Sequence, residues 1–315
     1  MRPVGKSARA IRRVLVIFPG ALGDLMCLLP ALAAISRRHP CASVDLMARF
    51  ELARLAAGRS VVARAHSIDA REVGDLFSDE IAERGGRFFG EFDRIYSFFA
   101  SDDARFRARL AAATDAEVSL HPFRPDGDGH VSAGYLRAIG EDASAIDARL
   151  EPTPDDLAAA SRVLTQSKCD PANLIVIFPG SGSPSKNWPP EKFVALAESG
   201  IKGASCVVVL GPAEASIEPM FREAGFTVLN DLDLPTVAAV ARPATAFVGN
   251  DSGVSHLAAA VGASGVVIFG PTDPVRWRPL SAGGRIDIIR REPIDSVEIR
   301  DVADAISKFV EQRLT

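Results

Sequence analysis

A five-residue segment occurs twice in this chain of 315 residues: Val16-Ile-Phe-Pro-Gly20 recurs as Val176-Ile-Phe-Pro-Gly180. In both copies a short apolar run ends in Pro-Gly, and a helical pattern follows. A strand, a glycine turn and a helix in this order form the opening unit of a parallel α/β sheet. Because one unit lies in each half of the chain, we expect two such domains, and the length agrees with that number.

Apolar runs and helical patterns alternate along the rest of the chain, which requires crossover connections and therefore parallel strands. Further buried strands are expected at 44–47, 94–98, 205–210, 227–229, 246–248 and 266–269. Further helices are expected at 104–113, 155–167, 216–224, 234–241, 254–261 and 301–313. The Pro- and Asp-rich stretch Glu151–Asp156 is typical of a linker that enters a capped helix. We therefore predict an N-terminal domain of residues 1–152 and a C-terminal domain of residues 153–315.

The segment Val14–Ile35 is almost continuously apolar and follows two arginines, a pattern that signal peptides and membrane helices share. Two features argue against both. Asp24 would lie near the middle of a membrane span, where an acid costs roughly 2.5–3.5 kcal/mol. The strand-and-turn segment also recurs far from the N-terminus, without basic residues before it. We expect a soluble, cytoplasmic protein.

The net charge of −4 gives no indication of nucleic-acid binding. Basic residues do cluster at the N-terminus, as a solvated tail or as a peripheral contact with anionic lipid at the inner membrane. These residues are Arg2, Lys6, Arg9, Arg12 and Arg13. The four cysteines, at 27, 41, 169 and 206, lack metal-like spacing. Buried thiols without disulfides, in a reducing compartment, are therefore expected.

The glycine turns exclude two nucleotide-binding classes. The turn Gly20-Ala-Leu-Gly23 lacks the third glycine of the dinucleotide-binding fingerprint. No turn continues into the Gly-Lys-Ser/Thr of a P-loop. The chain therefore lacks the main sequence signature of Rossmann-type oxidoreductases and of P-loop enzymes.

The most informative stretch is Phe247–Val261, where a strand ends in a polar turn and a helix of small residues begins near Ser252. The first turn of a helix offers backbone N–H groups and a positive dipole end, which bind phosphate without a metal. Gly253 would let the backbone approach a ligand closely, and Ser252 and His256 would add donors. The alternative is an ordinary helix start with Asp251 or Ser252 as its N-cap.

Three other residues follow predicted strands. Lys186 lies in a Gly/Ser loop and could stabilise a leaving diphosphate, or be a surface lysine, while Trp188 beside it is expected to pack the loop. Glu214 could hold a ribose diol, or simply begin a solvated helix. Asp24 could take the proton of an acceptor hydroxyl, or favour the start of its helix.

Together these motifs resemble glycosyltransferase family 9, the ADP-heptose:lipopolysaccharide heptosyltransferases. The matching pieces are Gly-x-x-Gly-Asp24, Lys186-x-Trp-Pro, Asn250-Asp-Ser-Gly-Val-Ser-His256 and Phe269–Trp277, in that order. The resemblance implies an α/β protein of the GT-B fold, with two Rossmann-like domains whose parallel sheets face each other across a cleft. The N-terminal domain would bind the acceptor and the C-terminal domain the donor. The last helix, about 301–313, would pack back on the N-terminal domain.

The resemblance also implies the roles of individual residues. Asp24 matches the catalytic base, and Lys186 matches the lysine that faces the donor phosphates. Glu214 would contact the ribose, and Leu232 would line the nucleoside pocket. The full set of implied substrate-binding residues is Gly20, Gly23, Ser181, Gly182, Glu214, Leu232, Asp251, Ser252, Gly253 and His256.

The implied reaction is an inverting transfer of heptose from ADP-heptose to a lipopolysaccharide-core or related glycan, with no metal and no cofactor. The partners would be the nucleotide-diphosphate sugar and a glycan or glycolipid acceptor. Three alternatives stay open: a nucleotide-sugar 2-epimerase of the same fold, a catalytically silent nucleotide-sugar-binding protein, and a metal-dependent GT-A enzyme. The last would use Asp126-Gly-Asp128, which follows no clear strand and is typical of a turn. The family commonly has an Asp-Leu-x-Gly segment where this chain has Arg94–Ser101, so the acceptor stays open as well.

Overall fold

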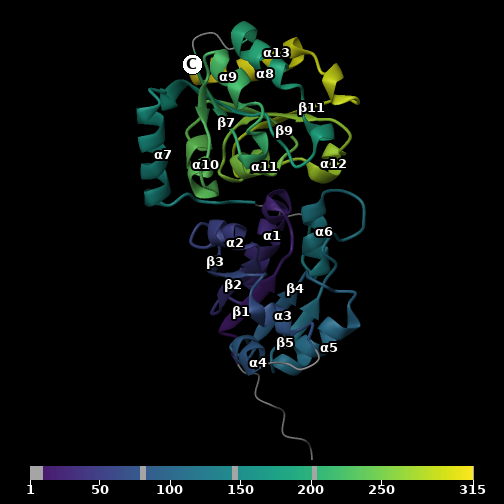
Figure 1. The fold of residues 1–315 in the computed structure, drawn as a ribbon. Coiled ribbons are helices and arrows are strands. Elements are labelled where there is room, and N and C mark those ends of the chain that lie inside the picture. Colours follow the sequence, from purple (N-terminus) through teal and green to yellow (C-terminus); the bar gives the residue numbers. More distant parts are fainter. Residues whose placement is uncertain (1–9, 79–82, 144–147, 201–203, 315) are drawn as a thin grey trace, which may run out of the picture. The chain divides into compact units, whose positions relative to one another are not determined.

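The computed structural model describes residues 10–78, 83–143, 148–200 and 204–314. The basic residues Arg2, Lys6 and Arg9 therefore lie outside the described residues. The chain divides into two compact units, one of residues 1–19 and 32–125 and the other of residues 20–31 and 126–315. Each unit contains its own parallel sheet (Figure 1).

The first sheet has the strand order β3-β2-β1-β4-β5, and every neighbouring pair is parallel. Its strands are β1 (Arg13–Ile17), β2 (Ser43–Ala48), β3 (Val62–Ser67), β4 (Arg94–Ser97) and β5 (Glu117–Leu120). The helices in this part of the chain are α1 (Leu22–Arg38), α2 (Phe50–Ala56), α3 (Arg71–Asp75), α4 (Glu83–Phe89), α5 (Ala104–Ala113) and α6 (Val131–Ala138). Neither of the edge strands β3 and β5 was predicted from the sequence. Edge strands are only half covered, so their residues need not form the apolar run that marks a buried strand.

The second sheet has the strand order β11-β10-β9-β6-β7-β8, again all parallel. Its strands are β6 (Leu174–Phe178), β7 (Ser205–Val209), β8 (Thr227–Leu229), β9 (Ala246–Asn250), β10 (Gly265–Phe269) and β11 (Ile286–Arg290). The helices are α7 (Pro154–Gln166), α8 (Pro190–Gly200), α9 (Glu218–Glu223), α10 (Leu234–Ala241), α11 (Gly253–Ala260), α12 (Pro274–Trp277) and α13 (Ile299–Leu314). Counted from β6, this is the strand order of a dinucleotide-binding Rossmann sheet.

The repeated segment forms β1 in one sheet and β6 in the other, as predicted. Both are interior strands, buried almost completely, which explains their purely apolar sequence. The strand order reverses at β1 and β4 in the first sheet and at β6 and β9 in the second. Ligands of such sheets bind outside the carboxyl ends of the strands at this reversal. In the second sheet, the loop after β6 and the turn after β9 therefore mark the expected site.

The predicted linker enters α7 through a capping box. The hydroxyl of Thr153 accepts from the Asp156 backbone N–H at 3.3 Å, and the Asp156 carboxylate accepts from the Thr153 N–H at 2.7 Å. All strands of the first sheet precede this point and all strands of the second follow it. The boundary between residues 152 and 153 stays a prediction, since the segments 20–31 and 126–152 group with the second unit.

Helix α13 packs against α8 and against β9, β10 and β11. Its apolar side chains Val302, Ile306 and Phe309 belong to the core of the second sheet. The structure thus gives this helix a role in the second unit, and its return to the N-terminal domain stays a prediction.

Among the described residues, no helix combines the length and apolar character needed to cross a bilayer. The apolar segment Val14–Ile35, which resembled a membrane helix, forms parts of β1 and α1, and α1 has only 17 residues. All four cysteines are free thiols, as predicted, but only Cys27 is fully buried and Cys41 is exposed. Cys41 lies in the turn between α1 and β2, outside the apolar layers.

Candidate active site

The turn after β9 leads directly into α11. Ser252 is the N-cap of this helix, and its hydroxyl accepts from the Ser255 backbone N–H at 3.4 Å. The Ser255 hydroxyl donates to the Asn250 carbonyl at 2.7 Å, which ties the helix to the end of the strand. The helix start predicted near Ser252 is therefore present, at the strand end where the sheet topology places a ligand site.

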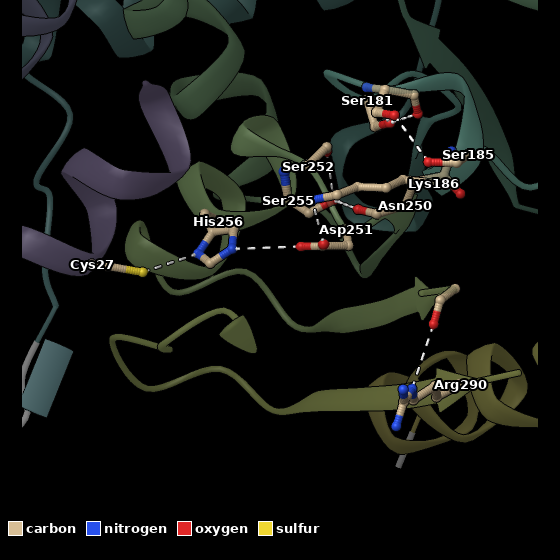
Figure 2. A network of polar contacts seen from close by, with 12 residues as sticks. Cys27, Ser181, Ser185, Lys186, Asn250, Asp251, Ser252, Ser255, His256 and Arg290 are labelled. Carbon is tan, nitrogen blue, oxygen red and sulfur yellow. Dashed lines mark hydrogen bonds and ion pairs between the residues drawn. The ribbon is translucent and has the colours of Figure 1, made fainter. Parts of the chain in front are cut away.

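The loop after β6 brings Lys186 to this turn. The Lys186 ammonium donates to Oδ2 of Asp251 at 2.8 Å, and the two side chains are 33% and 5% exposed (Figure 2). Asn250 holds the loop in place, because its amide donates to the Pro179 carbonyl at 2.7 Å and accepts from the Trp188 N–H at 3.0 Å. Lys186 is therefore not a freely moving surface lysine.

Trp188 has the structural role that the sequence predicted. Its side chain is fully buried and meets the ring of Phe193 edge-on, with centroids 4.9 Å apart. The indole N–H donates to the Val297 carbonyl at 3.1 Å. These contacts join the loop to the first turns of α8 and to the segment before α13.

The first turn of α1 packs against the first turn of α11. A Cβ atom on Gly253 would lie only 2.8 Å from Cβ of Leu22, and one on Gly23 would lie 3.5 Å from Cδ2 of His256. These two glycines therefore let the helix starts approach closely. Gly20, which is buried, ends the strand-to-helix turn just before α1.

Asp24 lies in this first turn and is 6% exposed. Its Oδ2 accepts from the Ala21 backbone N–H at 3.1 Å, which is the helix-start role weighed as the alternative. Burial lowers the pKa of the neighbouring His256, and the charge of Asp24 opposes part of that lowering. The structure thus brings the predicted base close to the predicted donor site, and its catalytic role stays a prediction.

His256 is buried between Asp251 and Cys27. Its Nε2 lies 3.9 Å from Oδ1 of Asp251, and its Nδ1 lies 3.8 Å from Sγ of Cys27 (Figure 2). Burial lowers the pKa of His256 to about 4, and it outweighs the opposing effect of Asp251. The imidazole is therefore neutral at neutral pH and carries one N–H donor.

The remaining predicted residues lie around this cluster. The Ser181 hydroxyl donates to the Ser183 carbonyl at 2.7 Å and shapes the loop, and Gly182 next to it is exposed. Glu214 accepts from the Gly211 backbone N–H at 2.9 Å. Its carboxylate lies over Gly180, where an added Cβ atom would overlap Oε1.

Leu232 is half-buried and follows Asp231, whose φ is +56°. The structure thus gathers Asp24, Gly23, Lys186 and the segment Asp251–His256. It brings Glu214 to the neighbouring strand end. Leu232 lies in the loop between β8 and α10.

Two contacts at the site were not predicted from the sequence. Cys27 contacts His256, but an isolated cysteine in an apolar helix carries no motif. Residues 126–130 form a loop that is bound to the region of α12: Arg276 donates to the Gly127 carbonyl at 2.9 Å, and His130 Nε2 donates to the Arg278 carbonyl at 2.8 Å. Asp126-Gly-Asp128 lies in this loop and follows no strand directly, which agrees with the prediction of a turn.

Residues 142–303, more than half of the chain, match glycosyltransferase family 9 (heptosyltransferase). The chain belongs to glycosyltransferase family 9. It is 24% identical to lipopolysaccharide heptosyltransferase 1 of Escherichia coli O18:K1:H7 (strain RS218 / NMEC), over 95% of this chain and 97% of that protein. The predicted enzyme class, a glycosyltransferase, is confirmed.

Solved structures of the family share the fold. The family 9 glycosyltransferase of Veillonella parvula DSM 2008 has a TM-score of 0.79 at 17% identity, covering 96% of this chain and 97% of that one. The ADP-heptose lipopolysaccharide heptosyltransferase II of E. coli has a TM-score of 0.73 at 19% identity, covering 96% and 100%. The predicted fold class, α/β of the GT-B type with two parallel Rossmann-like sheets, is confirmed, and a GT-A enzyme is excluded.

In the described part of this chain, no group of three or more His, Cys, Asp or Glu residues could hold a metal ion. A more distant neighbour, TibC of enterotoxigenic E. coli H10407, is described as iron-containing; its TM-score is 0.53 at 15% identity, covering 89% of this chain and 63% of that one. The absence of a metal requirement therefore stays a prediction.

Proposed function

We propose that this enzyme transfers heptose from ADP-heptose to a lipopolysaccharide-core or related glycan, with inversion and without a metal ion. The observation that carries the proposal is the pairing of Lys186 with Asp251 at the start of α11, where β6 and β9 end. The Lys186 ammonium, the N-terminus of α11 and the Asp251 carboxylate lie together there. The relatives named as lipopolysaccharide heptosyltransferases support the choice of sugar and acceptor.

The diphosphate would lie at the first turn of α11, beside Ser252 and Gly253, where the helix dipole favours negative charge. Lys186 would exchange its bond to Asp251 for one to a phosphate oxygen. Asp251, relieved of that bond, could then accept from hydroxyls of the sugar. The helix start and Lys186 together would stabilise the charge that develops on the leaving diphosphate, which is the role otherwise supplied by a divalent ion.

Asp24 would act as the general base. The acceptor hydroxyl attacks the anomeric carbon from the face opposite the nucleotide and passes its proton to the Asp24 carboxylate, and ADP leaves. His256 is given no part in this step, because its Nδ1 faces the Cys27 thiol and its Nε2 faces the Asp251 carboxylate. The rest of the donor would be held by Ser181 and Gly182 in the loop, Glu214 at the ribose, and Leu232 at the base.

A cytoplasmic location at the inner membrane would suit this reaction, and four free thiols agree with a reducing compartment. Of the basic N-terminal residues, Arg13 is used by the fold: it pairs with Asp45 at 2.9 Å and with Glu91. Among the described residues of that cluster, Arg12 is exposed and is the one available to lipid headgroups.

The donor can be tested by melting curves with ADP, UDP and GDP, because a ligand that binds the folded state raises Tm. ADP should give the largest shift. A larger shift with UDP or GDP would remove ADP-heptose as donor and leave the fold assignment intact. A companion assay follows ADP-heptose with and without an acceptor glycan. Conversion without acceptor would favour a 2-epimerase, and binding without turnover on any acceptor would favour a silent nucleotide-sugar-binding protein.

A further inference from the structure

A chain of polar side chains runs from α6 through α1 to the loop that carries Lys186. Sγ of Cys27 lies 3.8 Å from Nδ1 of His256, and Nε2 of His256 lies 3.9 Å from Oδ1 of Asp251. Asp251 is in turn bound to Lys186 at 2.8 Å. Figure 2 shows Cys27, His256 and Asp251 in a row, with the imidazole between the thiol and the carboxylate and Lys186 reaching Asp251 from another side.

Ser132 of α6 extends the row on the thiol side. Its side chain is fully buried, and it lowers the pKa of Cys27 as a hydrogen-bonding neighbour. The Ser132 hydroxyl makes no hydrogen bond within the usual distance and angle limits among the described residues. A hydroxyl hydrogen turned toward the Cys27 sulfur would satisfy it and would leave the single thiol hydrogen to point at His256.

Both ends of the imidazole favour the same arrangement of protons. A thiol hydrogen directed at Nδ1 requires a lone pair on that nitrogen. A carboxylate beside Nε2 favours an N–H there, because a lone pair facing Asp251 would be repelled. Burial reinforces both conditions: it raises the pKa of Cys27 to about 12, so the thiol keeps its hydrogen, and lowers that of His256 to about 4, so the ring stays neutral.

We propose that Cys27 is a positioning residue, whose thiol holds His256 as the neutral Nε2–H tautomer and so aims an N–H donor at Asp251 and at the oxygens of a bound diphosphate sugar. The proposal rests on the proposed function only for its ligand. It gives His256 the role of a donor of fixed direction. It also connects α1, which carries Asp24, to the side chain that pairs with Lys186.

The tautomer can be measured directly by ¹⁵N NMR of the imidazole nitrogens in the full-length protein. The chain has five histidines, and the signals lost in His256→Gln identify the relevant pair. In the wild type, Nε2 of His256 should carry the proton. A wild-type ring protonated on Nδ1 would overturn the proposal, whatever the variants show.

Two substitutions then separate the thiol hydrogen from the volume of the side chain. Cys27→Val fills the space without a donor and should give a mixture of tautomers, whereas Cys27→Ser keeps a donor and should restore at least part of the Nε2–H signal. ADP binding should weaken by roughly three- to tenfold in Cys27→Val, as expected when a hydrogen bond to a charged oxygen is partly lost. Cys206→Ala, a thiol on β7 that has no contact with His256, serves as the control and should match the wild type.

An unchanged Nε2–H signal in Cys27→Val would show that the thiol does not set the tautomer. If Cys27→Val fails to fold, the wild-type spectrum and Cys27→Ser still decide the matter. If ADP does not bind even to the wild type, the proposed function fails while the tautomer measurement stands on its own.

Discussion

The contact between the first turns of α1 and α11 can be tested by one added methyl group, Gly253→Ala. The new Cβ atom would lie 2.8 Å from Cβ of Leu22, 3.1 Å from its Cγ and 3.2 Å from the Gly23 nitrogen. Carbon atoms pack at about 3.5–4.0 Å, so the two helix starts must separate by at least about 0.7 Å. Because backbone as well as side chain is in the way, a change of rotamer cannot relieve the clash.

Two opposing terms set the effect on stability. Overpacking costs about 1–3 kcal/mol, whereas replacing glycine by alanine stabilises by about 0.4–1 kcal/mol through the unfolded chain. The cost of overpacking should exceed the gain from the unfolded chain. Tm should then fall by about 2–4 °C for each kcal/mol of net destabilisation in a unit of 150–250 residues. Gly74→Ala, in α3 with open space around the added methyl, is the matched control and should not lower Tm.

Gly253→Ala is expected to affect catalysis more than stability. Asp24 lies in the displaced turn of α1, and a shift of about 1 Å in a catalytic group can cost 10²-fold in rate. Steady-state kinetics should show kcat reduced by roughly 10- to 100-fold in Gly253→Ala and unchanged in Gly74→Ala. A Gly253→Ala enzyme with wild-type kcat at a temperature well below its Tm would refute the argument that this close contact positions Asp24.

Four further predictions concern the site itself. Asp24→Asn should lower kcat by about 10²–10⁴ with little change in ADP affinity; near-normal turnover would mean that Asp24 only caps its helix, since asparagine caps equally well. Lys186→Ala should weaken ADP binding by about tenfold or more as well as reduce turnover, and EDTA should leave wild-type activity unchanged. Activity lost in EDTA and restored by magnesium or manganese would contradict a metal-free mechanism. Lowering the pH should destabilise the wild type through His256, whose pKa is about 4 in the folded protein. Between pH 6.5 and pH 4 the unfolded chain binds a proton on this side chain and the folded protein does not, so protonation favours unfolding. The contribution of neutral His256 to the free energy of unfolding is fully present above pH 6.5 and is lost as the pH falls towards 4. Urea titrations at each pH should show the wild type losing roughly 3 kcal/mol more than His256→Gln over this range.

The fold class and the central residues of the site could be predicted from the sequence alone. Interior parallel strands are apolar along their whole length, so β1 and β6 were recognisable, and the repeated Pro-Gly turn showed that the unit is used twice. Asp24, Lys186 and Asp251–His256 each follow a predicted strand within a few residues. The rule that ligands bind at the carboxyl ends of strands therefore indicated them before any tertiary contact was known.

Three of the four edge strands, β3, β5 and β11, were not predicted from the sequence. β3 and β11 each bury only one side chain and β5 buries none, so no apolar run marks them. The fourth edge strand, β8, was predicted, because Val228 and Leu229 are buried and apolar. For the residues after β5 the sequence indicated only a turn at Asp126–Asp128. Their loop is bound by Arg276 and by the Arg278 carbonyl, almost 150 positions away in the chain.

Only the tertiary structure decided what these side chains do to one another. The contact of Cys27 with His256 joins residues separated by 229 positions, and no local pattern encodes such a pair. The same holds for Glu214, which lies over Gly180, and for Lys186, whose partner in this structure is Asp251. Periodicity and turn chemistry report on neighbours along the chain, whereas burial, ion pairing and a histidine pKa of about 4 depend on which distant elements the fold packs around a group.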